Sequence, residues 1–180
     1  MKRLLIIILA FAMATGANAQ VKQVTLQASG LTCSMCSNAI YKALSKLSFA
    51  NHVTSNIKTS TYTLTFKEGA DVDFDAIRKA VDDAGFSVVK MEVTANFSNV
   101  QINNDAHIVL GGKALHFLAV KDQVLSGEQT FKIVDKHFVA DKEYKKYAAS
   151  TQMECVKTGT MKPCCHMPNV TGNRIYHVTV

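Results

Sequence analysis

The stretch that decides the fold of this chain is residues 28–40, which read ASGLTCSMCSNAI. Just before its loop, three apolar residues alternate with polar ones, as in a half-buried strand: Val24, Leu26 and Ala28. Further on, Cys36 and four apolar residues recur at the spacing of one helix face: Ile40, Ala43, Leu44 and Leu47. The sequence therefore predicts that Cys33 and Cys36 lie on the loop and first turn that join a strand to a helix.

The start of a helix favours the reactive thiolate form of a cysteine. The first turn of a helix has unpaired backbone N–H groups and the positive end of the helix dipole, and both favour a thiolate over a thiol. Two such sulfurs one helical turn apart can bind a soft metal ion, exchange disulfides, or bond to each other. Gly30 allows the loop to bend sharply. Metal binding is the interpretation that we favour.

A thiol–disulfide oxidoreductase acting through the same pair is the alternative from a different functional class. Redox enzymes of the thioredoxin type normally have an aromatic residue before the first cysteine, often a proline within the motif, and a cis-proline loop that faces it. None of these features is present, because the only prolines are Pro163 and Pro168. An inert disulfide between Cys33 and Cys36 is a third interpretation.

Residues 30–36, GLTCSMC, resemble the G-M-T-C-x-x-C loop of heavy-metal-associated domains, the family of small copper chaperones and of the metal-binding modules of metal-pumping ATPases. Leu31 stands where methionine is usual, and an apolar residue of similar size is expected to pack comparably. The resemblance covers about residues 21–93, under half of the chain. It implies a ferredoxin-like fold, Cys33 and Cys36 as metal ligands, and an aromatic ring at Phe86 beside the metal loop.

Periodicity alone reaches the same fold for this region. A hairpin follows the first helix, with alternating faces of two strands: Val53, Ser55 and Ile57, then Tyr62, Leu64 and Phe66. Asp73 is expected to cap a second helix, Gly85 to end it, and residues 86–93 to form a last strand. The predicted order β-α-β-β-α-β is that of an α+β, ferredoxin-like domain.

The beginning of the chain is typical of a targeting signal. Lys2 and Arg3 precede an apolar run over residues 4–13, and the small residues of the sequence ANA at 17–19 predict cleavage after Ala19. The apolar run is too short to span a bilayer, so we expect no stable membrane insertion after cleavage. The loss of Lys2 and Arg3 lowers the formal net charge from +6 to +4. The prediction is a periplasmic or secreted protein.

The rest of the chain has no resemblance to guide it. We expect residues 1–19 to be the signal peptide, 20–95 the ferredoxin-like domain, 96–104 a polar linker, and 105–180 a mostly-β domain. Short apolar runs at 106–110, 115–120, 130–134 and 174–180, with one helix near 141–147, predict a small barrel of the OB type. An OB-type barrel can bind oligonucleotides, normally through stacking aromatics on a basic groove, but an exported protein rarely meets such a ligand, so no nucleic-acid partner is expected.

Two thiolates without further ligands suit Cu(I) or Hg(II), because Zn(II) prefers four ligands. In zinc-handling members of the resembled family an aspartate often occupies the position of Thr32. The favoured ion is therefore Cu(I), with Hg(II) or Zn(II) as alternatives.

A second group of sulfur and imidazole side chains lies near the C-terminus. It contains Met153, Cys155, Met161, Cys164, Cys165, His166 and Met167. This set of donors is that of a soft-metal site, and a disulfide from Cys155 to Cys164 or Cys165 is the competing prediction. Five cysteines cannot all pair within one chain. The other histidines have no ligand spacing and are expected to be surface or strand residues: His52, His107, His116, His137 and His177.

Taken together, the sequence predicts an exported heavy-metal-binding protein rather than an enzyme. It would act as a Cu(I) chaperone or scavenger of a bacterial envelope, with mercury capture as the nearest alternative. Its chemistry would be ligand exchange, in which a thiolate on a partner takes over the ion. The expected partners are a metal-transporting membrane protein or another metal-binding domain.

Overall fold

The computed structural model describes residues 20–31, 33–165, 167–168, 170 and 172–180. The predicted signal peptide over residues 1–19 lies outside this part, as do Thr32 and His166 and the side chain of Cys164. No helix among the described residues is long and apolar enough to cross a membrane.

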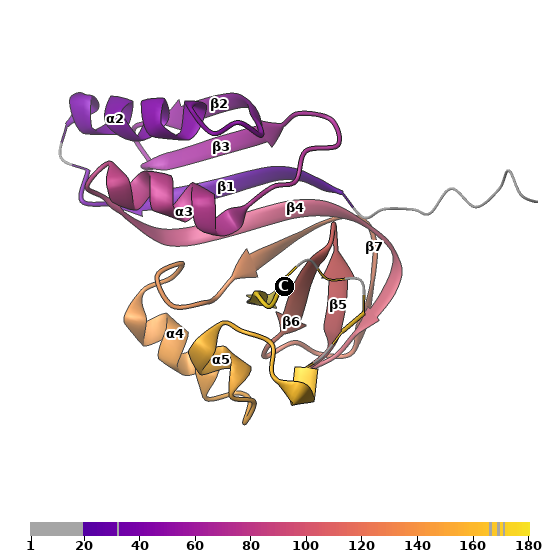
Figure 1. The fold of residues 1–180 in the computed structure, drawn as a ribbon. Helices are drawn as coiled ribbons and strands as arrows, with labels where there is room; N and C mark the ends of the chain where they lie inside the picture. The colour runs from indigo at the N-terminus through magenta and orange to yellow at the C-terminus, as the bar shows by residue number, and fades with distance from the viewer. Residues whose placement is uncertain (1–19, 32, 166, 169, 171) are drawn as a thin grey trace, which may run out of the picture.

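The first half of the described chain has the predicted ferredoxin-like order. Its elements are β1 (Val21–Ser29), α2 (Ser34–Ser45), β2 (Ala50–Asn56), β3 (Thr61–Phe66), α3 (Phe74–Asp83) and β4 (Ser87–Ile102). The four strands lie side by side in the order β2-β3-β1-β4, and every neighbouring pair is antiparallel. Helices α2 and α3 lie together on one side of these strands (Figure 1).

The ends of the second helix follow from local chemistry. The Asp73 carboxylate accepts a hydrogen bond from the Ala76 N–H at 3.0 Å and so caps the start of α3. Gly85 follows the helix with φ of +89°, a left-handed conformation that glycine adopts without strain. The buried residues Phe74, Ile77 and Val81 then attach this helix to the sheet.

Strand β4 continues far beyond the predicted strand. It runs through most of the segment that was expected to be a linker at 96–104, so an irregular linker there is wrong for residues 96–102. The register of β4 against β7 (Gln123–Ile133) shifts between Phe97 and Val100, and Asn99 within the shift has φ of +53°. Such a bulge bends a strand and interrupts its two-residue alternation, which hides the strand from a search for periodicity. The division into two domains stays a prediction.

The second half is mostly strand, as predicted, but it does not form a closed barrel. Its remaining elements are β5 (His107–Leu110), β6 (Lys113–Phe117), α4 (Asp141–Ala148), α5 (Cys155–Thr158), a 3₁₀ turn (Pro163–Cys165) and β8 (Ile175–Thr179). The eight strands of the described residues form one open sheet in the order β2-β3-β1-β4-β7-β8-β6-β5. The prediction of an OB barrel is therefore wrong, because β7 pairs along the extended β4 and leaves β5 as an edge strand.

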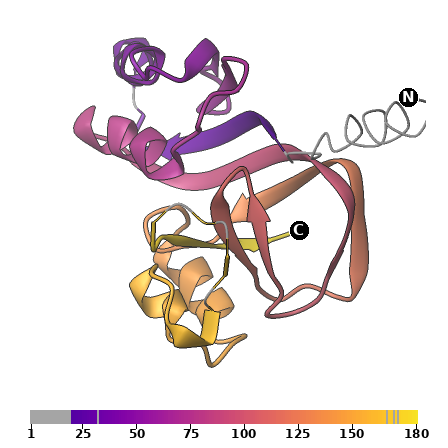
Figure 2. The ribbon, with the colours of Figure 1, turned by 45° about the vertical axis from the view of Figure 1, so that its right-hand side comes forward.

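The interior is continuous across the two halves. One apolar cluster extends from the ferredoxin-like half to strands of the second half, with Val24, Phe74, Phe117, Phe131 and Val178 among its fully buried members. Figure 2 shows β4 between the α2 and α3 side of the molecule and the α4 and α5 side. A smaller cluster around Cys155 and Cys165 lies in the second half.

Candidate functional site

The two motif cysteines lie where the sequence predicts them. Cys33 occupies the cap position of α2, and its sulfur accepts a hydrogen bond from the Cys36 N–H at 3.3 Å. The Cys33 side chain is exposed and the Cys36 side chain is half-buried. Their Sγ atoms are 2.8 Å apart, so one ion can contact both sulfurs after a small change of rotamer.

The sheet holds the start of this helix in place. The buried Tyr62 of β3 donates its hydroxyl to Ser37 Oγ at 2.9 Å, and Ser37 itself is 3% exposed. Because Ser37 directly follows Cys36, this contact fixes the first turn of α2 relative to β3. The first turn of α2 is therefore anchored on its inner side, while Cys33 remains exposed.

The loop between β1 and α2 has the conformation that its glycine allows. Gly30 has φ of +83°, and a Cβ at this position would lie 3.8 Å from Cδ1 of Phe86. The Phe86 ring thus lies beside the loop, as the family resemblance implies. Leu31 packs against the main apolar cluster, which fits its expected role as a substitute for methionine.

The chemistry available at this site is that of two sulfurs with an open side. Met35 lies between the two cysteines in sequence, and it is 80% exposed. Among the described residues, which leave out Thr32, no third His, Cys, Asp or Glu joins Cys33 and Cys36 in a group of possible metal ligands. This arrangement suits an ion with few ligands and leaves room for the sulfur of a partner.

The structure brings several of the predicted C-terminal residues together. Cys155 is 0% exposed and Cys165 is 3% exposed, and both belong to the smaller apolar cluster with Ala114 and Ile175. Three half-buried methionines pack against that cluster: Met153, Met161 and Met167. The disulfide and the soft-metal site both stay predictions, since His166 and the side chain of Cys164 lie outside the described part of the chain.

Three histidines that were expected to be ordinary surface or strand residues lie beside Cys155. They are on strands, but His116 and His177 are 0% and 1% exposed and His107 is half-buried. Burial lowers the pKa of His107 and lowers that of His116 to about 4, so both rings are neutral at pH 7. Sequence spacing missed this group because neighbouring strands, rather than chain order, bring it together.

Known proteins resemble the N-terminal half of the chain. Residues 25–87 match the heavy-metal-associated domain. The "Mercuric transport protein periplasmic component" of Pseudomonas fluorescens is 33% identical over 86 residues, which are 48% of this chain and 93% of that protein. The "Probable copper-exporting P-type ATPase" of Archaeoglobus fulgidus is 34% identical over 65 residues, or 36% of this chain, but the chain spans only 8% of that protein. The crystal structure of oxidized MerP from Ralstonia metallidurans CH34 is 34% identical, covers 38% of this chain and 96% of that chain, and has a TM-score of 0.34.

Proposed function

Because the chain belongs to the heavy-metal-associated domain family, we propose that it is an exported protein that carries Cu(I) on Cys33 and Cys36 as a chaperone or scavenger. The observation that supports this best is the pair of sulfurs 2.8 Å apart at the surface end of α2. A surface position is what a transfer site needs, because a partner's sulfur must reach the ion.

The reaction that we propose is ligand exchange. A thiolate on the partner adds to the copper ion, and the bond from the ion to Cys33 or Cys36 then breaks. The remaining sulfur leaves in the same way. No covalent bond of a substrate is made or broken, so no catalytic residue is required.

Copper is favoured over zinc by the number of ligands. Two sulfurs with no further described His, Cys, Asp or Glu suit linear or trigonal Cu(I). The same argument holds for Hg(II), and the relatives are named for copper export in one case and for mercuric transport in another. Hg(II) capture is therefore our second candidate.

We propose a location in the periplasm or outside the cell on two grounds. The sequence at residues 1–19 has the pattern of a cleavable signal, and one relative is named as a periplasmic component. The natural partner would be a metal-transporting membrane protein or another metal-binding domain that presents its own thiolates.

A competition assay tests the site and the ion. The reduced protein is titrated without oxygen against a chromogenic Cu(I) chelator, and separately against a thiol competitor for Hg(II). We expect Cys33→Ser and Cys36→Ser each to weaken Cu(I) binding by several orders of magnitude, since one of two thiolate ligands is lost. Both variants should keep the wild-type circular dichroism spectrum, because the sulfurs lie outside the apolar core.

Met35→Leu is the matched control. It removes a sulfur between the two cysteines without a change of size, and its side chain is exposed, so Cu(I) affinity should not change. Wild-type affinity in Cys33→Ser or Cys36→Ser would place the site elsewhere. Reduction of insulin by the wild-type protein at the rate of a dedicated oxidoreductase would favour the redox alternative.

A further inference from the structure

Three neighbouring strands place three histidines in a row across the second half of the sheet. His107 of β5 pairs with His116 of β6, and His116 pairs in turn with His177 of β8. The first two rings are stacked with centroids 4.2 Å apart, and the rings of His116 and His177 meet edge to face at 5.1 Å. Cys155 is the first residue of α5, and its sulfur lies beside the rings of His116 and His177.

The distances from the Cys155 sulfur to the ring nitrogens that face it are those between the ligands of one metal ion. The Cys155 sulfur lies 3.6 Å from Nδ1 of His116 and 3.5 Å from Nε2 of His177. A tetrahedral ion bound at about 2.3 Å by sulfur and at about 2.0–2.1 Å by nitrogen holds these two atoms about 3.6 Å apart. Donor atoms of His107, His116 and Cys155 also all lie within 4.8 Å of one another.

The hydrogen bonds on the outer side of the rings direct lone pairs toward the sulfur. Nε2 of His116 lies 2.9 Å from a carboxylate oxygen of Asp105, and Nδ1 of His177 lies 2.5 Å from a carboxylate oxygen of Asp135. Because an ionised carboxylate only accepts, each of these ring nitrogens carries the proton. In the neutral form of each ring, the opposite nitrogen, which faces Cys155, presents a lone pair.

Hydrogen bonds within this group cannot satisfy all of its ring nitrogens. A thiol has one proton, so it can donate to only one of the two nitrogens that face it. In addition, Nε2 of His107 is buried and has no hydrogen-bond partner among the described residues. A cation at the centre would satisfy all of these lone pairs at once.

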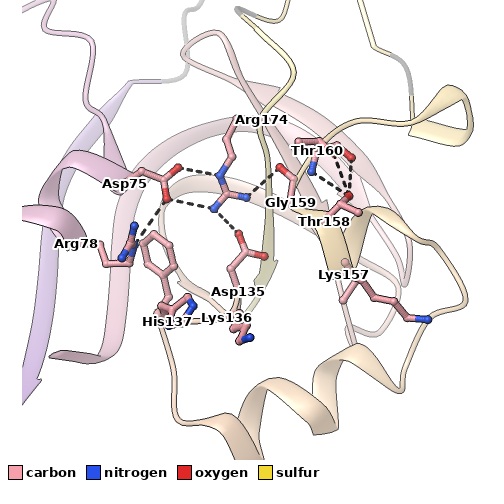
Figure 3. Close-up of a pocket in the computed structure, with 12 residues that line it drawn as sticks. Asp75, Arg78, Asp135, Lys136, His137, Lys157, Thr158, Gly159, Thr160 and Arg174 are labelled. Carbon is pink, nitrogen blue, oxygen red and sulfur yellow. Dashed lines mark hydrogen bonds and ion pairs between the residues drawn. The ribbon is translucent and has the colours of Figure 1, made fainter. Parts of the chain in front are cut away.

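Asp135, whose carboxylate contacts the outer nitrogen of His177, is itself held in place. The guanidinium of Arg174 lies 2.8 Å from Asp135 and 2.8 Å from Asp75 of α3 (Figure 3). The Asp135 side chain is buried, at 5% exposed, and the guanidinium of Arg174 supplies the opposite charge beside it. Carboxylates behind ligating histidines orient the rings and raise their affinity for metal.

We infer that Cys155, His107 and His116, whose donor atoms all lie within 4.8 Å of one another, form a buried binding site for a copper or zinc ion, with His177 as a fourth donor beside the Cys155 sulfur. One thiolate with imidazoles suits these ions and not Mg²⁺ or Ca²⁺, which take oxygen ligands. The site differs from the one predicted from sequence, because it draws its nitrogen ligands from the strands instead of from residues 161–167. Burial makes the ion a resident of the fold, in contrast to exchangeable cargo.

The test uses the Cys33→Ser/Cys36→Ser double variant, which lacks the surface site, after reduction and removal of metal. Co(II), Zn(II), Cu(I) and Cu(II) are each added alone. We expect one equivalent of Co(II) to give a sulfur-to-cobalt charge-transfer band and the visible bands of a tetrahedral ion. Zn(II) or copper should displace it, and the concentration at which each does so ranks their affinities for the site.

Matched variants in the same background assign the ligands. Cys155→Ser, His116→Gln and His177→Gln should lose the charge-transfer band or weaken Co(II) binding at least 100-fold. Cys165→Ser, a buried cysteine in the same cluster, and His52→Gln, an exposed histidine, should keep it. Loss of the band in Cys165→Ser with retention in Cys155→Ser would overturn the inference.

X-ray absorption of the Zn(II)-loaded Cys33→Ser/Cys36→Ser variant identifies the ligands without any substitution at the buried site. We expect one sulfur at about 2.3 Å and two or three nitrogens at about 2.0–2.1 Å. A shell with no sulfur, or with two sulfurs, would contradict the inference. Failure to bind any of the four ions after reduction would do so as well, and a Cys155 disulfide recovered by peptide mapping of the untreated protein would then support the rival crosslink.

Discussion

The two cysteine-bearing regions of the molecule differ in what surrounds the sulfur. Cys33 is exposed and Cys36 half-buried, at the start of a helix that the buried Tyr62 anchors on its inner side. Cys155 is fully buried and faces two imidazoles that carboxylates hold from behind. An ion at the first place would have few ligands and an open side, and an ion at the second would be enclosed. We therefore propose transfer at Cys33 and Cys36 and retention at Cys155, although both places begin with a thiol.

The reactivity of the thiols is the property in which the two regions should differ most. With the reduced, metal-free protein, iodoacetamide should modify Cys33 at least about 100-fold faster than Cys155, because a fully buried thiol reacts only after local opening. Timed quenching and mass spectrometry of the peptides measure both rates in one sample.

Metal gives the internal control for that experiment. One equivalent of Cu(I) should slow the modification of Cys33 and Cys36 and leave the slow rate of Cys155 unchanged. Equal rates for Cys33 and Cys155 without metal would remove the contrast on which the comparison rests.

The carboxylate behind His116 should affect only the buried site. In Asp105→Asn the amide can still accept a hydrogen bond, but the negative charge that increases the basicity of the ring is lost. We expect Co(II) binding at the buried site to weaken about 10- to 100-fold. The backbone should tolerate the change, because Asp105 has φ of +63° and asparagine adopts such angles readily.

Titration of the Cys33→Ser/Cys36→Ser variant with and without Asp105→Asn measures this effect. Asp122→Asn, at an exposed position, is the control and should leave affinity unchanged. Cu(I) competition at the surface site should not respond to either substitution. If Asp105→Asn weakened both sites equally, its effect would be on folding rather than on His116.

The smallest expected effect is on stability, and it concerns Asp75 of α3, which connects the ferredoxin-like half to Arg174 in the second half. Asp75 of α3 binds Arg174 at 2.8 Å and accepts a hydrogen bond from the Tyr176 hydroxyl at 3.0 Å. Burial alone would raise the pKa of Asp75, but the contacts with Arg174 and Tyr176 outweigh it and lower the pKa below 3.8. Asp75→Asn should lower the free energy of unfolding by about 1 kcal/mol at pH 7.

The sign of the pH dependence follows from that lowered pKa. The stabilisation by Asp75 is complete above its unfolded-state pKa and is lost as the pH falls through about 4 toward the folded value. Urea unfolding at several pH values should therefore show the difference between wild type and Asp75→Asn shrinking below pH 4. A difference that grew in acid would contradict this assignment.

The ferredoxin-like half could be predicted from sequence because its determinants are local. The alternation before Gly30, the helical spacing after Cys36 and the cap at Asp73 each act within a few residues. They were sufficient to place Cys33 and Cys36 at the junction of strand and helix. The same local logic failed at residues 96–102, because the bulge at Asn99 interrupts the alternation of a strand that continues.

The histidine row could not be predicted in this way. His107, His116 and His177 become neighbours only through the pairing of β5, β6 and β8, and the last pairing is a parallel one between residues 61 positions apart. No spacing along the chain encodes that register. The open sheet was missed for a related reason, since short strands indicate β structure but do not say which edges remain unpaired.

The most direct test of the account is the rate at which copper leaves each site. The reduced protein is loaded with two equivalents of Cu(I) and mixed with an excess of a chromogenic chelator in a stopped-flow instrument. We expect one equivalent to leave rapidly from wild type and from Cys155→Ser, and this rapid phase to be absent from Cys33→Ser/Cys36→Ser. A rapid phase of unchanged size in that double variant would contradict the claim that Cys33 and Cys36 hold the exchangeable ion.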